Sequence, residues 1–181
     1  MIVAAVVLPA VTAHGQGQDQ FALGISAGVT IPAGVGADLH KTGYNATVMW
    51  GIGSVDSPFG IRFDGMYSSL GEKSNTGLTT PVGEAKVTSI SANFLINTLG
   101  SNYHLYLIGG LGGFSYNPDG AGTKSKTDFG LNAGAGLFLP GVNTFIEARW
   151  FNFYRALPDV DTNVSGKRAL QIFPITVGVM F

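Results

Sequence analysis

Cysteine is absent from the 181-residue sequence, which excludes disulfide bonds and thiolate metal sites. Charged residues are scarce as well: they make up 12% of the chain, about half their usual share in soluble domains. With a net charge of −1, the chain lacks the basic excess that is typical of nucleic-acid-binding proteins. After the first dozen residues there is no run of about 18 apolar residues, so the sequence does not predict membrane-spanning helices.

Hydrophobic residues, in contrast, make up 45% of the chain, and 27 glycines accompany them. The final stretch, FPITVGVMF, has a large apolar group at every second position, which places these groups on one face of a β-strand. They are Phe173, Ile175, Val177, Val179 and Phe181. A strand that closes a barrel in lipid needs such an apolar face, and aromatic rings are favoured where it meets the membrane interface.

Seven earlier segments are also predicted as strands. With the last one they cover residues 21–31, 44–52, 59–67, 89–96, 103–116, 129–137, 146–154 and 173–181. The connections alternate between long loops (32–42, 71–85, 117–127 and 158–167) and short turns. This pattern predicts an all-β fold, an eight-stranded antiparallel up-and-down transmembrane β-barrel in one domain, 21–181. Segment 103–116 is apolar on both faces, so alternation leaves its facing open.

The first residues are typical of an export signal. Residues 2–13 form an apolar run too short to span a bilayer, and Ala13-His14-Gly15 offers small residues around a cleavage point. We therefore expect a signal peptide over 1–15 and a polar leader over 16–20. No Lys or Arg precedes the run, a departure from the pattern that is explained if the true start lies upstream. The alternative is a buried N-terminal strand.

The composition of the face opposite the large apolar groups indicates which face of each predicted strand meets lipid. It carries mainly Gly, Ala, Ser, Thr and Asn, which suit the narrow interior of a small barrel. A soluble lipocalin-like binder, the alternative, would turn the apolar face inward and expose many Lys and Glu on the other. The apolar face is therefore expected to point outward into lipid.

Aromatic and basic residues mark the two predicted rims. The six lysines lie in or beside the long loops, and the short turns hold only Asp56. The six lysines are Lys41, Lys73, Lys86, Lys124, Lys126 and Lys167, and they are candidates for contacts with lipopolysaccharide phosphates. The expected interfacial aromatics are Phe21, Tyr44, Phe59, Tyr67, Phe94, Phe129, Phe138, Phe145 and Tyr154.

This pattern, from residue 21 to 181, resembles the small eight-stranded outer-membrane barrels of didermic bacteria, a group that includes the opacity proteins and the OmpA and OmpX barrels. The terminal strand ending in Phe181 resembles the signal read by the barrel-assembly machinery. The resemblance implies a monomer in the bacterial outer membrane, exported through the periplasm, with periplasmic short turns and extracellular loops. It does not carry over a specific function.

Four charged residues fall within strand interiors, all on the inward parity: Arg62, Asp64, Glu147 and Arg149. Their strands lie on opposite walls of an eight-stranded barrel, so we expect an ion-pair cluster across the lumen. Two cations balance two anions, as a low-dielectric interior requires. The cluster is interpreted as a structural plug; the alternative is an ion gate.

Apart from these four charged residues, the sequence offers few candidates for a catalytic or metal-binding site. The predicted role is structural and surface-exposed, with loops for adhesion or recognition, and no cofactor or metal site is expected because no His/Asp/Glu spacing suits one. The alternative is an enzyme that modifies outer-membrane lipid. Its candidate histidines are His40, in the first loop, and His104, interpreted as an interfacial side chain, but neither forms a His-x-Ser pair on a strand face.

Overall fold

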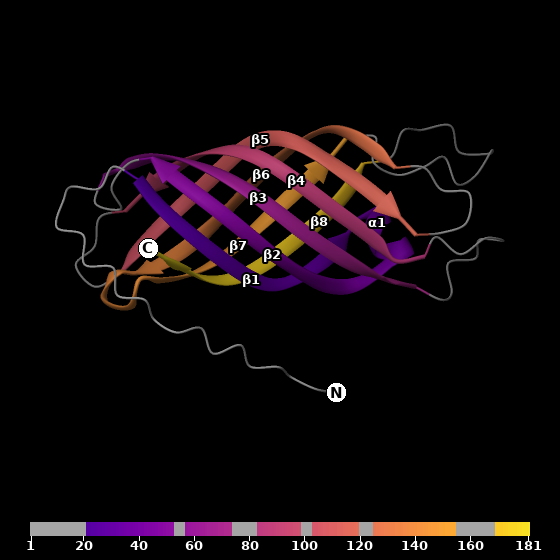
Figure 1. Ribbon diagram of the computed structural model, residues 1–181, viewed down its shortest axis with the longest axis horizontal. Helices are drawn as coiled ribbons and strands as arrows, with labels where there is room; N and C mark the ends of the chain where they lie inside the picture. Colours follow the sequence, from indigo (N-terminus) through magenta and orange to yellow (C-terminus); the bar gives the residue numbers. More distant parts are fainter. Residues whose placement is uncertain (1–20, 53–56, 74–82, 99–102, 120–124, 155–168) are drawn as a thin grey trace.

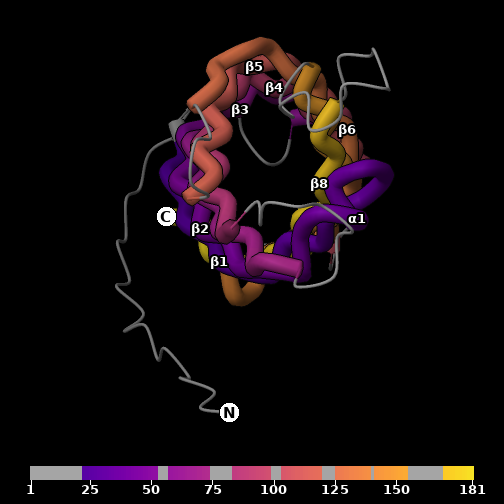
Figure 2. Tube along the Cα trace, turned by 90° about the vertical axis from the view of Figure 1, so that its right-hand side faces the viewer, coloured from indigo at the N-terminus to yellow at the C-terminus, as the bar shows by residue number. Residues whose placement is uncertain are grey.

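The computed structural model describes residues 21–52, 57–73, 83–98, 103–119, 125–154 and 169–181. The expected signal peptide and leader (1–20) lie outside this part of the chain. Eight antiparallel strands form one closed barrel in which each strand pairs with the next in sequence and the last pairs with the first (Figures 1 and 2). They are β1 (Phe21–Ala33), β2 (His40–Ile52), β3 (Phe59–Glu72), β4 (Ala85–Asn97), β5 (His104–Pro118), β6 (Lys126–Leu139), β7 (Thr144–Phe153) and β8 (Leu170–Met180). The predicted fold class is confirmed.

The connection between β1 and β2 differs from the prediction. Both strands extend into the expected loop 32–42, and only Gly34 and the short helix α1 (Val35–Leu39) separate them. Leu39 is buried and Val35 packs against the same apolar cluster, so the connection is drawn down onto the end of the barrel. Lys73 also holds α1 there, because its Nζ donates a hydrogen bond to the carbonyl oxygen of Ala37. We call this the long-loop end of the barrel, and the opposite end the short-turn end (Figure 1).

The facing of β5, which alternation left open, is fixed by its neighbours. Gly113 pairs with Ile90 of β4 on one side and with Phe129 of β6 on the other, and both of these side chains face outward. Register therefore turns the odd-numbered residues of β5 outward and the even-numbered ones, such as Tyr106 and Phe114, inward.

The outer surface of the barrel is covered by large apolar side chains. They come from all eight strands, and Ile90 and Phe129 are each 72% exposed. The soluble lipocalin-like alternative is wrong, because its apolar face would line the interior and the outer surface would be charged. Among the described helices, none has both the length and the apolar character needed to cross a membrane.

The predicted interfacial aromatics divide into two groups. The exposed, outward-facing ones are Tyr44, Phe59, Tyr67, Phe94, Phe129 and Tyr154. The predictions for Phe138 and Phe145 are wrong: they are 7% and 2% exposed and point into the barrel. Phe138 follows the outward-facing Leu137, and Phe145 precedes the outward-facing Ile146. Alternation along each strand therefore turns the phenylalanine ring inward. The side chain of Phe21 lies outside the described part.

Candidate functional site in the barrel lumen

The four inward charges meet at the middle of the lumen. Arg62 and Asp64 come from β3 and Glu147 and Arg149 from β7, on the opposite wall. Arg62 Nε lies 2.9 Å from Asp64 Oδ1, and Arg62 Nη2 lies 2.7 Å from Glu147 Oε2. Arg149 completes the ring, with Nη2 2.7 Å from Asp64 Oδ2 and Nε 2.8 Å from Glu147 Oε1. All four side chains are buried, and we call this ring the ionic cluster.

Neutral polar side chains from other strands support the ionic cluster. Tyr106 Oη of β5 donates a 2.7 Å hydrogen bond to Glu147 Oε2. Asn93 Nδ2 of β4 donates to Asp64 Oδ2 at 3.0 Å, and Asn132 Nδ2 of β6 donates to Asn93 Oδ1 at 2.8 Å. Five of the eight strands are thereby joined through one network of buried side chains. Such networks fix geometry because every unpaired member in a low-dielectric interior is costly.

Sequence reasoning did not single out these three partners. Asn93 and Asn132 lie on the inward parity of their strands, so alternation could have placed them in the lumen. Tyr106 could not be found in this way, because the facing of its strand was undetermined by alternation.

Apolar layers lie on both sides of the ionic cluster. Toward the long-loop end, a cluster of buried residues fills the lumen; it includes Leu70, Phe114, Tyr116, Phe153 and Ile172. A smaller one lies toward the short-turn end and comprises Met49, Tyr106, Ile108, Phe138 and Phe145. The expectation of an interior lined mainly by small polar residues is therefore correct only near the middle. The strands continue past the outward-facing Tyr44 and Tyr67 at the long-loop end, and there the barrel has an apolar core of its own.

Both described histidines lie inside the barrel. His40 Nε2 is 2.9 Å from Tyr116 Oη, under α1 at the long-loop end. The interpretation of His104 as an interfacial side chain is wrong: it is 6% exposed, and its ring lies beside Phe138 in the lumen. It starts β5 on the inward parity, which the sequence pattern of that strand did not show. Within the described ranges, no three His, Cys, Asp or Glu side chains are grouped to hold a metal ion.

The lysines and the terminal strand occupy the two rims. Lys41 and Lys73 are exposed at the long-loop end, and Lys86 forms a 2.9 Å ion pair there with Asp119, which raises the pKa of the Lys86 amine. Lys126 begins β6 at the same end, whereas positions 124 and 167 lie outside the described residues. The alternating residues of β8 face outward, and Phe181 is 55% exposed at the short-turn end.

Comparison with known proteins identifies the structures that share this fold. A scan against protein-family models and a search of curated proteins find no match. Among solved structures, Neisserial surface protein A is similar over 91% of this chain and 98% of its own, with a TM-score of 0.59 and 19% identity. The chain has the fold of the small outer-membrane barrels.

Two further structures share this small outer-membrane barrel fold. The outer membrane enzyme PagL aligns over 87% of this chain and 98% of its own, with a TM-score of 0.52 and 11% identity. The N-terminal β-barrel domain of Pseudomonas aeruginosa OprF aligns over 88% and 97%, with a TM-score of 0.51 and 18% identity. A surface protein, an enzyme and a β-barrel domain thus use one fold, so function has to be argued from this chain's own side chains.

Proposed function

We propose that this protein is a bacterial outer-membrane barrel with a structural and surface-presentation role. It anchors itself in lipid through its strands and presents the loops of the long-loop end outside the cell for adhesion or recognition. The observation that carries this proposal is the continuous apolar outer surface around a lumen closed by the ionic cluster and by the apolar layer toward the long-loop end. Only lipid covers such a surface on every strand of a closed barrel.

A lumen that is closed at its middle and toward the long-loop end favours a structural role over a transport role. Arg62 and Arg149 bridge opposite walls at the middle of the barrel, and the aromatic side chains toward the long-loop end close the path beyond them. Opening a channel would break several buried ion pairs at once, which is energetically costly. The ionic cluster is thus proposed as a plug that also fixes the positions of β3 and β7 on opposite walls of the barrel, not as an ion gate.

The protein should migrate differently on a detergent gel before and after boiling, and it should fractionate with outer membranes. This follows because a closed barrel resists detergent until it is heated. In planar bilayers the folded protein should show no unitary current steps. Reproducible steps in the wild type, lost on chemical crosslinking of the barrel, would contradict the plug, whereas recovery in the soluble periplasmic fraction would contradict the membrane location.

The enzyme alternative has one structural neighbour in its favour, the outer membrane enzyme PagL. The placement of the described histidines speaks against it here. His40 and His104 are both turned into the lumen, away from the outer surface where a lipid substrate would lie. An unchanged lipid A mass spectrum in cells that express the protein is expected, and a new lipid A species would favour the enzyme.

The lysine-rich rim is proposed to contact lipopolysaccharide. All six lysines of the chain lie toward the long loops, where anionic headgroup phosphates of the outer leaflet would be reached. Replacing all six with glutamine should weaken binding of purified lipopolysaccharide about tenfold or more, measured by co-migration or calorimetry with detergent-folded protein. A matched variant with six arginines, which keeps the charge, should bind like the wild type. Equal binding by the glutamine variant would remove the proposal.

The terminal strand and the oligomeric state complete the proposal. The outward residues of β8, ending at Phe181, are proposed to be recognised by the barrel-assembly machinery, and the barrel is proposed to be a monomer. Support comes from the outward side chains of β8, which lie along one face of the strand and are exposed on the surface of the barrel.

A further inference from the structure

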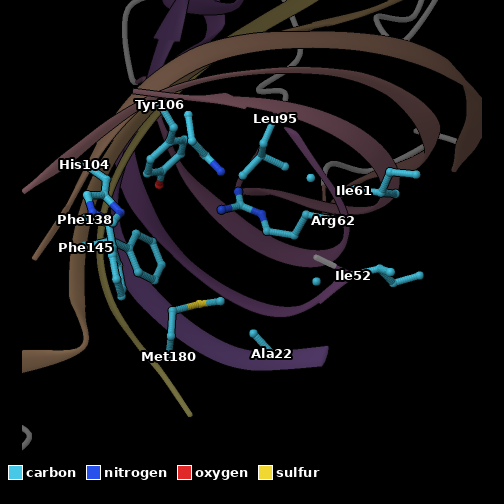
Figure 3. Close-up of a pocket in the computed structure, with 13 residues that line it drawn as sticks. Ala22, Ile52, Ile61, Arg62, Leu95, His104, Tyr106, Phe138, Phe145 and Met180 are labelled. Carbon is cyan, nitrogen blue, oxygen red and sulfur yellow. The ribbon is translucent and has the colours of Figure 1, made fainter. Parts of the chain in front are cut away.

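The lumen contains a cavity of about 70 Å³ on the short-turn side of the ionic cluster. All eight strands contribute to its lining at the ends that face the short turns, from Ala22 at the start of β1 to Met180 at the end of β8. Figure 3 shows His104, Tyr106, Phe138, Phe145, Leu95 and Met180 around one space together with Arg62, whereas the side chains of Ile52 and Ile61 point away from it. Since a single water needs about 10–15 Å³ by this measure, the space accommodates several waters or one small ring.

The walls of the cavity are mainly apolar. Phe138 and Phe145 lie on one side and Leu95 and Met180 on the others, as the close-up shows (Figure 3). Aromatic and thioether groups of this kind pack well against a flat apolar ring. Water held here would make few hydrogen bonds, so its displacement by an apolar group is favourable.

Two polar groups from β5 interrupt this apolar lining. Tyr106 donates its hydroxyl proton to Glu147, and its Oη also interacts with the Arg62 guanidinium, so one lone pair of the oxygen remains to accept a further hydrogen bond. His104 lines the same cavity, and its buried Nδ1 has no hydrogen-bond partner in the protein. An unpaired buried nitrogen is costly, and a ligand that reached it would recover that cost. Acceptor and unpaired nitrogen together match a hydroxyl group, which both donates and accepts.

Charge decides between a neutral and an ionic ligand. Arg62 is the charged residue in the lining, and its guanidinium is already engaged by Asp64 and Glu147. The ionic cluster contains two positive and two negative side chains, so the inner side of the cavity has no net charge to offer. A ligand carrying a full charge would therefore lose its hydration without a free counter-charge.

We infer that this cavity is a binding site for a small uncharged amphiphile, a single ring or short chain with one hydroxyl group, that enters from the short-turn end. The apolar body packs between Phe138, Phe145 and Met180, and the hydroxyl group bonds to Tyr106 and His104. The ionic cluster forms the floor, so the ligand binds in a dead end and does not pass through the barrel.

The test uses full-length folded protein in detergent micelles and three fluorinated probes followed by ¹⁹F NMR. The probes are 4-fluorophenol, fluorobenzene, which lacks the hydroxyl group, and 4-fluorobenzoate, which is charged. Partition into empty micelles is measured and subtracted for each probe. We expect saturable binding of 4-fluorophenol, about 25-fold weaker binding of fluorobenzene because both hydrogen bonds of the hydroxyl group are lost, and no saturable binding of 4-fluorobenzoate.

Two variants and one matched control localise the site. Ala22→Phe, on the inward face of β1, should fill the cavity and abolish saturable binding of 4-fluorophenol. Ala27→Phe makes the same change on the same strand at an exposed outward position and should leave binding unchanged. His104→Leu should weaken 4-fluorophenol about fivefold and leave fluorobenzene unaltered.

Each outcome decides the inference. Equal binding by Ala22→Phe and the wild type, or binding that is explained by micelle partition alone, overturns the cavity as a site. Tighter binding of the benzoate than of the phenol overturns the uncharged ligand class. If Ala22→Phe does not give the heat-modifiable folded form, the test depends on His104→Leu, in which the preference for 4-fluorophenol over fluorobenzene should fall about fivefold; an unchanged preference overturns the inference.

Discussion

Replacing Arg62 with alanine should lower the free energy of unfolding by about 3–5 kcal/mol, because it leaves two buried carboxylates to share one cation. Arg62 bridges Asp64 on its own strand and Glu147 across the lumen, and its side chain is 5% exposed. Arg149 still contacts both carboxylates but cannot neutralise two negative charges. The measurement is guanidinium unfolding of protein folded in lipid vesicles, followed by the fluorescence of the outward-facing Trp50 and Trp150.

The control for this prediction is Lys86→Ala. Lys86 also forms an ion pair, with Asp119, but about half of each side chain is exposed. Solvent screens such a pair, so the unfolding midpoint should not change measurably. Replacing Arg149 with alanine should likewise lower stability without producing conductance. A large conductance in either arginine variant at unchanged stability would show that the ionic cluster acts as a gate, against the role proposed here.

Replacing Gly110 with alanine should lower the free energy of unfolding by about 3 kcal/mol or prevent folding. Gly110 lies on the inward face of β5, where an added Cβ would overlap the carbonyl oxygen of Ala92 and the side chain of Asn93. Backbone atoms cannot give way there without separating β4 from β5. Asn93 also donates to Asp64, so the displacement would reach the ionic cluster. The same unfolding assay measures the effect.

Gly113→Ala is the matched control on the same strand. Gly113 faces outward, and an added Cβ would meet nothing within 4 Å. Because alanine has fewer conformations in the unfolded chain, the substitution should be neutral or raise stability by up to about 1 kcal/mol. Equal losses at the two positions would mean that glycine is needed in β5 for its backbone freedom, and not for the close approach of β4 at Gly110.

The alternation of apolar and polar residues alone predicted much of the fold. Apolar groups at every second position from Phe173 to Phe181, and in six of the other segments, indicated strands and which of their faces is apolar. The scarcity of charge on the opposite face indicated that lipid lies outside. The same parity placed Arg62, Asp64, Glu147 and Arg149 inside, where the structure brings them together. These conclusions depend on local chain geometry, because successive side chains of a strand point to opposite faces wherever the strand lies.

The predictions were wrong where strand alternation gave no information or where a general residue preference was applied against it. Phe138 and Phe145 were assigned to the interface as aromatics near strand ends, although their own parity turns them inward. The first connection, residues 32–42, was predicted as a loop, yet Val35 and Leu39 fold it onto the end of the barrel. In both cases packing against the interior outweighed the general preference of aromatics for membrane interfaces and of glycine-rich segments for loops.

The sequence by itself determined that this chain forms an eight-stranded barrel with its apolar face outward and four charges within. Only the tertiary structure decided how β5 faces, that Tyr106 and Asn93 join the ionic cluster, and that a cavity lies between this cluster and the short turns. The direction in which a side chain points follows from alternation along its own strand. Contacts across a lumen depend instead on the register of every pair of strands around the closed barrel. No single strand contains that information.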